Sequence, residues 1–251
     1  MADPSALSFD DDESAPITGE RTVPGVREEN YWFQRHVVAY EYASTLVRGL
    51  RVLDAGCGEG YGPDLLAAAG GEVVGVDLEP EIVHRARARY PRVTFDIANL
   101  VSLPYPDASF DAVVSLQVIE HLHTPQEFLS EAKRVLAPGG RLIISTPNRL
   151  TFSPEGSRNP FHAFEFSPDE LHATLSRRFT EIEVLGTFHG AGLTILERLL
   201  RKPFPERLLD QPAYEWPHWL QNRVASVTPR DFRIGPRRIE RSLDLIALAR
   251  T

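Results

Sequence analysis

A glycine-rich turn flanked by carboxylates is the part of the sequence best suited to bind a small molecule. Asp54-Ala55-Gly56-Cys57-Gly58-Glu59-Gly60 follows a short apolar run, and Asp77 ends the next apolar run. Glycine permits the backbone angles of a tight turn and lets a ligand approach closely. The spacing G-x-G-x-G differs from the G-x-G-x-x-G of pyrophosphate sites. Asp54 would repel a pyrophosphate but suits a cationic amino-acid group, and Asp77 is placed to accept hydrogen bonds from ribose hydroxyls.

A second group of residues could activate an oxygen atom. Glu120 and His121 follow another apolar run, and His162 lies in a long loop further along the chain. Carboxylate and imidazole groups bind divalent ions, which lower the pKa of a bound hydroxyl. Alternatively, His121, His162 or His189 could act as a general base. A third interpretation gives the Glu-His pair and the loop histidine no chemical role.

These residues can act together only if helices and strands bring them to the same edge of a sheet. Helical patterns cover 28–48, 63–69, 80–90 and 123–136, and the last of these is expected to close at Pro138-Gly139-Gly140. Alternation of such strands and helices predicts an α/β fold with a doubly wound, mostly parallel, seven-stranded sheet and helices on both faces. The strands are expected at 51–54, 72–78, 93–98, 109–116, 141–147, 180–188 and 242–249.

The sequence pattern also divides the chain into segments. Residues 1–16 are acidic and predicted to be disordered. Residues 17–48 are expected to form a cap helix over the ligand site, and residues 49–189 the core domain. Segment 148–170 is expected to be a long loop, and the Pro- and Trp-rich segment 190–240 an insertion that serves as a lid or a dimer contact. Residues 241–251 would supply the last core strand.

Composition excludes several classes of partner. The chain of 251 residues has a formal net charge of −8, which argues against a nucleic-acid ligand. No apolar run is long enough for a membrane span. Cys57 is the single cysteine, so no intrachain disulfide can form, and a reducing cytoplasm is the expected compartment. We interpret Cys57 as a packing residue and not a nucleophile, since no base lies beside it in the sequence.

Several motifs together resemble the class I S-adenosylmethionine-dependent methyltransferases. They are DAGCGEG, GVDL, LPYPDASFDAVVS, VIEHL, RVLAPGG and IISTPN, and the resemblance covers about residues 28–188 and the last strand. It implies S-adenosylmethionine as cofactor and S-adenosylhomocysteine as product. By this resemblance Asp77 binds the ribose, Leu78, Asn99 and Leu100 flank the adenine, and Arg35 or His36 meets the cofactor carboxylate. The remaining implied cofactor residues are Asp54, Gly56, Cys57, Gly58, Gly60, Tyr61 and Gln117.

The second group of residues is similar to a metal site in two branches of that family. These are the O-methyltransferases of ubiquinone biosynthesis and the small-RNA terminal 2′-O-methyltransferases. The latter bind a divalent ion through E-x-x-E-H and a later histidine; here Gln117 replaces the first carboxylate. The resemblance implies a divalent ion on Glu120, His121 and His162, with Gln117 adjacent. Magnesium or manganese is expected, and two imidazoles suit Mn²⁺ or Zn²⁺ at least as well as Mg²⁺.

The flanks resemble a small actinobacterial group linked to methylglucose and methylmannose polysaccharides, which implies a gluco- or manno-oligosaccharide hydroxyl as acceptor. The motifs that carry this resemblance are residues 19–24, 29–33, 35–36, 159–162 and 188–190. Aromatic side chains could offer flat faces to sugar rings, although packing is the simpler role for each of them. Three alternatives stay open: an aromatic or quinone-like acceptor, a noncatalytic cofactor-binding regulatory protein, and an RNA 2′-hydroxyl acceptor.

Overall fold

The computed structural model describes residues 22, 24–154, 159–200 and 215–251, so the predicted disordered segment 1–16 lies outside the described residues. The helices are α1 (Asn30–Leu46), α2 (Tyr61–Ala68), α3 (Pro80–Arg89), α4 (Pro125–Val135), α5 (Arg149–Phe152), α6 (Pro168–Leu175), α7 (Ala191–Leu200) and α9 (His218–Ala225). The strands are β1 (Arg51–Ala55), β2 (Glu72–Asp77), β3 (Thr94–Ile97), β4 (Phe110–Leu116), β5 (Leu136–Pro147), β6 (Thr180–His189), β7 (Phe232–Gly235) and β8 (Asp244–Arg250).

The described strands form one eight-stranded sheet in the order β3-β2-β1-β4-β5-β8-β6-β7. Strands β3, β2, β1, β4 and β5 are parallel, whereas β8 runs antiparallel to both β5 and β6. The order of the chain reverses between β1 and β4. The predicted doubly wound, mostly parallel sheet is therefore confirmed, with one strand more than predicted, because β7 forms within segment 190–240.

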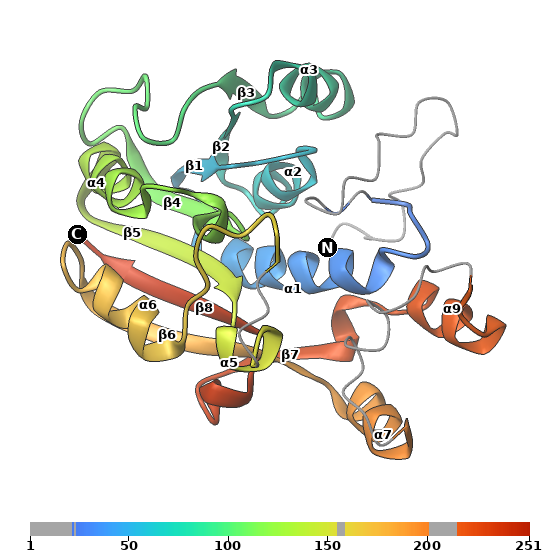
Figure 1. Ribbon diagram of the computed structural model, residues 1–251. Helices are drawn as coiled ribbons and strands as arrows, with labels where there is room; N and C mark the ends of the chain where they lie inside the picture. The colour runs from blue at the N-terminus through green and yellow to red at the C-terminus, as the bar shows by residue number, and fades with distance from the viewer. Residues whose placement is uncertain (1–21, 23, 155–158, 201–214) are drawn as a thin grey trace. The chain divides into compact units, whose positions relative to one another are not determined.

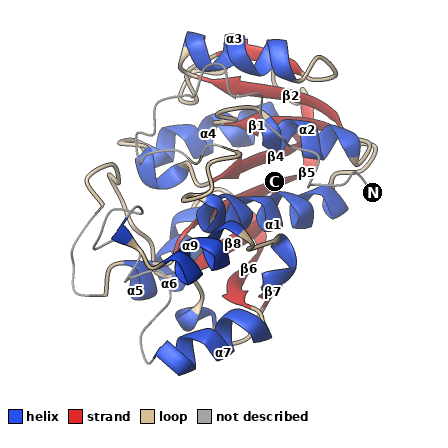
Figure 2. Cartoon of the chain, turned by 90° about the vertical axis from the view of Figure 1, so that its right-hand side faces the viewer, coloured by secondary structure: helices blue, strands red, loops and turns tan. Residues whose placement is uncertain are grey.

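Helices cover both faces of the parallel part of the sheet. One face packs Leu53, Val113 and Ile144 against Phe128 of α4 and Leu171 of α6, all of them buried. Right-handed crossovers on the two sides of the reversal place helices on opposite faces. Figures 1 and 2 show α4 and α6 on one side of the sheet and α2 and α3 on the other.

Two segments differ from the sequence prediction. The helix predicted to close at Pro138-Gly139-Gly140 ends at Val135, and β5 begins at once at Leu136, which pairs with Phe110. The predicted loop 148–170 contains α5 and the start of α6. Ser167 and Glu170 form a capping box there, because the Ser167 side chain accepts from the Glu170 backbone and the Glu170 carboxylate accepts from the Ser167 backbone.

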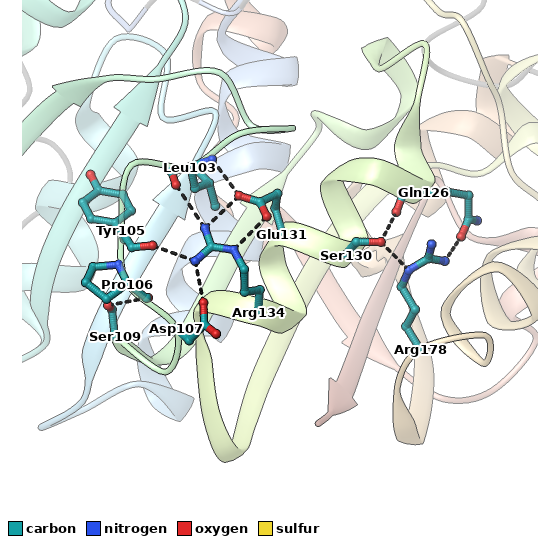
Figure 3. A network of polar contacts seen from close by, with 10 residues as sticks. All are labelled: Leu103, Tyr105, Pro106, Asp107, Ser109, Gln126, Ser130, Glu131, Arg134 and Arg178. Carbon is teal, nitrogen blue, oxygen red and sulfur yellow. Dashed lines mark hydrogen bonds and ion pairs between the residues drawn. The ribbon is translucent and has the colours of Figure 1, made fainter.

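The long connection between β3 and β4 is fixed by one arginine of α4. The Arg134 guanidinium donates to the carbonyls of Leu103 and Tyr105 and pairs with the carboxylates of Glu131 and Asp107 (Figure 3). Glu131 also accepts from the Leu103 backbone N–H. The cluster thus fixes the part of the connection that leads into β4.

The contacts divide the chain into two units. The first consists of Met1–Val38 and Phe188–Arg233, and the second of Ala39–Thr187 and Ile234–Thr251. Within the first unit, the Asn30 side chain donates to the carbonyls of Val224, Ala225 and Val227 and so ties the start of α1 to the end of α9. Among the described residues, no helix is both long and apolar enough to cross a membrane.

Candidate active site

The glycine-rich turn leaves β1 with three left-handed glycines. Gly56, Gly58 and Gly60 have φ values of 84°, 50° and 85°, a region that favours glycine. The backbone N–H groups of Gly56 and Cys57 both donate to the Val76 carbonyl at 2.9 Å. The turn is thereby fastened to the end of β2.

The three glycines are needed for different reasons. A Cβ on Gly56 would lie 2.6 Å from the Val118 side chain, and one on Gly60 would lie 2.8 Å from Ala86. Packing alone excludes side chains at these two positions. A Cβ on Gly58 would meet nothing within 4 Å, so its surface is open. Gly58 is the position where a ligand can approach the backbone.

Asp54 is fully buried at the end of β1. Tyr40 donates its hydroxyl to Asp54 Oδ1 at 3.4 Å, while Asp54 Oδ2 has no hydrogen-bond partner among the described residues. Burial above all, with a smaller contribution from the Asp77 charge, raises the pKa of Asp54 to about 8. A cationic group beside this carboxyl would satisfy the unpaired oxygen and favour the ionised form.

Asp77 is held by the turn and by its own helix start. Its Oδ2 accepts from the Gly58 backbone N–H at 2.9 Å, and its Oδ1 accepts from the Glu79 backbone N–H at 3.2 Å. The next side chain, Leu78, is 63 % exposed although it is large and apolar. A fixed carboxylate beside an open apolar side chain fits a ribose carrying a base.

The residues expected beside the adenine follow β3. Asn99 is exposed and its side-chain oxygen accepts from the Val101 backbone N–H, whereas Leu100 is buried. Gln117 directly follows β4 with a left-handed φ of 58°, and its side chain donates to Ser145 on β5. Of the other turn residues, Tyr61 is buried beside Tyr40, and burial raises the pKa of Cys57, so its thiol stays protonated.

The structure brings Glu120, His121 and His162 together. One ligand atom from each of the three side chains lies within 4.8 Å of the others. The loop that carries His162 is fastened to the turn after β4, because the N–H groups of Ala163 and Phe164 both donate to the Glu120 carbonyl, at 2.8 and 3.0 Å. Residues from two segments far apart in the sequence thus share one cluster.

Glu120 is the buried member of this cluster. Its side chain is inaccessible, and Oε2 has no hydrogen-bond partner among the described residues. Burial above all, with smaller contributions from the carboxylates of Asp244 and Glu165, raises the pKa of Glu120 to about 8. An unpaired buried carboxylate next to two imidazoles fits a divalent ion, which would supply the missing positive charge.

The two imidazoles are oriented by partners on their Nδ1 atoms. His121 Nδ1 lies 2.9 Å from the Phe161 carbonyl, and His162 Nδ1 lies 3.2 Å from Glu165 Oε1. Their rings meet edge to face with centroids 5.1 Å apart, and Phe152 packs on His162 from the other side. Burial lowers the pKa of His162, and His121 lowers it further, so the neutral imidazole is favoured.

The other predicted site residues belong to the first unit. Arg35 is buried with its guanidinium over the Tyr31 ring, and His36 Nδ1 lies 3.1 Å from the Thr22 hydroxyl. His189 lies between two partners. Its Nε2 is 2.6 Å from the Tyr31 hydroxyl and its Nδ1 is 2.9 Å from Glu197. Arg35, His36 and His189 stay predictions as functional residues.

Sequence reasoning did not find two supporting residues. Tyr40, the partner of Asp54, lies inside an amphipathic helical pattern in which its polar group gives no signal. Glu165, the partner of His162, lies between two phenylalanines and was not predicted as a site residue. Its spacing of three from His162 was the available signal.

Comparison with known proteins identifies the family. A family model described as a methyltransferase domain matches residues 53–144. A probable S-adenosylmethionine-dependent methyltransferase from Mycolicibacterium smegmatis is 47 % identical over 245 residues, which cover 93 % of this chain and 94 % of the relative. The chain belongs to the S-adenosylmethionine-dependent methyltransferases.

Two further comparisons bear on this methyltransferase. The crystal structure of an S-adenosylmethionine-dependent methyltransferase from Thermotoga maritima, described as a possible histamine N-methyltransferase, has a TM-score of 0.63 at 20 % identity and covers 90 % of this chain and 95 % of its own. At that identity it shows the fold alone. A ubiquinone biosynthesis O-methyltransferase from Xanthomonas axonopodis pv. citri is 36 % identical over 119 residues, which cover 45 % of this chain and 50 % of the relative.

The residues present in this methyltransferase fit S-adenosylmethionine. The open backbone at Gly58, the Asp54 oxygen without a partner among the described residues and the fixed Asp77 carboxylate lie at or beside the carboxyl ends of β1 and β2. They match a thin sulfonium chain, a cationic amino group and a ribose in that order. In open α/β sheets a ligand binds beyond the carboxyl ends of the strands where the chain order reverses, which is here between β1 and β4.

Proposed function

We propose that this methyltransferase transfers the methyl group to a hydroxyl of a gluco- or manno-oligosaccharide, with a divalent cation bound by Glu120, His121 and His162. The single observation that supports the metal-assisted O-transfer is the convergence of these three side chains. All three follow, or are fastened to, the carboxyl end of β4, next to the cofactor turn. The assignment of individual residues to the cofactor belongs to the same proposal.

The chemistry of methyl transfer to a hydroxyl group determines which functions the protein must provide. S-adenosylmethionine, when bound, supplies an electrophilic methyl group on a sulfonium. The acceptor oxygen forms the new C–O bond, the C–S electron pair stays on sulfur as the thioether of S-adenosylhomocysteine, and the hydroxyl proton goes to solvent. An alcohol is a weak nucleophile, so the protein must favour loss of that proton and hold the oxygen in line with the methyl carbon.

The charge balance of the cluster favours a cation over a general base. The side chains of Glu120 and Glu165 are both buried in this cluster, and Glu165 Oε1 lies 3.2 Å from His162 Nδ1. Buried charges need a partner of opposite sign. A divalent cation would balance these carboxylates and lower the pKa of a coordinated hydroxyl. Two imidazole ligands make Mn²⁺ or Zn²⁺ as suitable as Mg²⁺.

The surface around the cluster favours a ring-shaped acceptor. Phe161 and Phe164, on the loop that carries His162, are 44 % and 42 % exposed, and Leu150 on α5 is 41 % exposed. Exposed aromatic faces beside polar groups suit sugar rings, which combine apolar faces with hydroxyl edges. The sugar itself is proposed from the resemblance of the flanking motifs.

A quinone-like or other aromatic acceptor is the second candidate. The partial similarity to the ubiquinone O-methyltransferase of Xanthomonas supports it, and the same exposed phenylalanines would stack on an aromatic ring. The noncatalytic alternative finds no support in the family membership. A dimer contact through 190–240, a cytoplasmic location and the absence of a nucleic-acid partner stay predictions of the sequence.

The test is methyl transfer from labelled S-adenosylmethionine to a panel of acceptors. The panel holds short gluco- and manno-oligosaccharides, partly methylated forms of each, a catechol and a small RNA, each with Mg²⁺, with Mn²⁺ and with EDTA. We expect transfer to a saccharide that EDTA abolishes and Mn²⁺ restores. Transfer to the catechol alone would replace the sugar with an aromatic acceptor. Full saccharide transfer in EDTA, with no metal in the protein, would overturn the metal site.

A further inference from the structure

The two histidines of the candidate metal site both have a hydrogen-bond partner on Nδ1. A backbone carbonyl can only accept a hydrogen bond, so the 2.9 Å contact with Phe161 places the His121 proton on Nδ1. His121 Nε2 therefore carries the lone pair. His162 needs the same arrangement to offer its Nε2, but its Nδ1 partner is a side chain, Glu165, at 3.2 Å.

The Glu165 side chain is buried within the loop that carries His162. Its side chain is 2 % exposed, and Oε1 also accepts from the Asn159 backbone N–H at 3.4 Å. The neighbouring Phe164 N–H is fastened to the Glu120 carbonyl. The same short segment thus delivers His162 and the carboxylate behind it to the cluster.

We propose that Glu165 is a positioning residue that holds His162 in the Nδ1-protonated form and turns its Nε2 toward Glu120 and His121. The inference rests on the metal site of the proposed function and assigns no contact between Glu165 and the metal. A carboxylate behind a ligating histidine fixes the ring and strengthens its donor atom. Loss of such a partner weakens metal binding by about 10- to 100-fold.

The first readout needs no metal. In full-length, metal-free protein labelled with ¹⁵N in histidine, the ring shifts of His162 report which nitrogen carries the proton. The variants are Glu165→Ala, Glu165→Gln and, as the matched control, Asp169→Asn, an exposed carboxylate of α6. We expect the Nδ1-protonated form in the wild type and in Asp169→Asn. Glu165→Ala should shift the population toward the Nε2-protonated form that dominates in free imidazole side chains.

The second readout is Mn²⁺ affinity by calorimetry on the same proteins. Glu165→Ala should bind Mn²⁺ about 10- to 100-fold more weakly, and Glu165→Gln, which keeps an acceptor oxygen for Asn159, by a smaller factor. Methyl transfer should recover in both variants when Mn²⁺ is raised above the new Kd. A purely structural role would lower kcat at saturating Mn²⁺ as well. If Glu165→Ala does not fold, Glu165→Gln carries both readouts.

The outcomes separate this inference from the proposed function. Mn²⁺ binding that both Glu165 variants leave unchanged, with the ring tautomer unchanged, overturns the role of Glu165 and leaves the metal site standing. A wild type that binds no Mn²⁺ overturns the metal site and the positioning role with it. A weaker affinity with a shifted tautomer supports both.

Discussion

At the scale of single residues, Gly58 and Gly60 separate ligand binding from packing. Both have a positive φ, but a Cβ on Gly60 would overlap Ala86 and touch the Phe95 ring at 3.0 Å, whereas a Cβ on Gly58 meets open space. The same motif therefore contains one glycine packed against the protein interior and one beside open space, where we propose that the cofactor binds.

Gly58→Ala and Gly60→Ala should fail in different ways. Gly58→Ala should cost about 1 kcal/mol of stability, the strain of an alanine in left-handed backbone, and should weaken S-adenosylhomocysteine binding about tenfold or more. Gly60→Ala should cost about 2 kcal/mol or more, because overlap in the core adds to the strain. Urea unfolding and calorimetric titration measure the two effects. Wild-type affinity in Gly58→Ala would contradict the assignment of that backbone to the cofactor.

Asp54 gives the protein a pH dependence of known sign. Its pKa rises from 3.8 in the unfolded chain to about 8 in the folded protein because burial penalises the charge. Between these two pKa values, Asp54 is ionised in the unfolded chain and protonated in the folded protein, so rising pH favours unfolding. The contribution of Asp54 to stability is thus complete below about pH 4 and is lost as pH rises through about 8.

Asp54→Asn should therefore flatten the loss of stability of the cofactor-free protein between pH 5 and pH 8, to an extent on the order of 2 kcal/mol. The same variant should bind S-adenosylmethionine more weakly, since the amide cannot balance a cationic amino group. Urea unfolding across this pH range is the measurement. The control is Glu240→Gln, an exposed carboxylate that should leave the slope unchanged. Equal slopes in the wild type and Asp54→Asn would contradict the account.

At the scale of elements, side chains of α4 fix the connection between β3 and β4 in place. Arg134 joins two carboxylates and two carbonyls, and on the far side of the helix Arg178 donates to Ser130 at 2.8 Å and bonds Gln126 (Figure 3). The buried Phe128 anchors the helix to the sheet. The position of residues 98–109 thus depends on the polar contacts of Arg134, because these residues form no helix or strand of their own.

Arg134→Met should destabilise the protein by about 2 kcal/mol, since several charge-assisted hydrogen bonds are lost and the Leu103 and Tyr105 carbonyls lose their donor. Hydrogen exchange should become faster in 98–109 and stay unchanged in β1 and β2. Arg177→Met, at an exposed arginine on the turn after α6, is the control. Thermal unfolding that does not distinguish the two variants would show that the cluster is not structural.

Sequence patterns predicted the elements whose signals are local. β1, β2 and β4 are largely buried apolar runs with a polar or glycine residue at or just after their ends, so these strands could be expected. β7 was missed because four residues, Phe232–Gly235, carry no alternation of their own and depend on the sheet edge. The start of β5 at Leu136 was missed because Pro138-Gly139-Gly140 is typical of a turn, and only pairing with Phe110 makes the segment a strand.

In the candidate site, too, the residues with a local sequence signal could be predicted, and those that depend on tertiary contacts could not. Glu120 and His121 could be placed beside the cofactor turn, because they follow a strand at the end where parallel strands meet. His162 was added by resemblance, and the structure brings it to the cluster through main-chain hydrogen bonds to Glu120. Those hydrogen bonds depend on the conformation of the loop, which no periodic pattern in the sequence predicts.

At the scale of the whole molecule, ligands of the two halves of the site should stabilise the chain additively. Cofactor at about 100 times its Kd should add about 2.7 kcal/mol to the free energy of unfolding. Mn²⁺ should add a further increment that His162→Ala abolishes while the cofactor increment stays. His172→Ala, an exposed histidine of α6, should retain both increments. Thermal unfolding measures both, and a Mn²⁺ increment preserved in His162→Ala would place the ion elsewhere.

The most direct test of the central claim is pulsed electron paramagnetic resonance of Mn²⁺ bound to the full-length methyltransferase loaded with S-adenosylhomocysteine. The account predicts one tightly bound Mn²⁺ with couplings to two imidazole nitrogens. His121→Ala and His162→Ala should each remove one of these couplings, and Glu120→Gln should weaken binding while both couplings remain at high Mn²⁺. A bound Mn²⁺ without nitrogen couplings, or no bound Mn²⁺, would contradict the assignment of Glu120, His121 and His162 as its ligands.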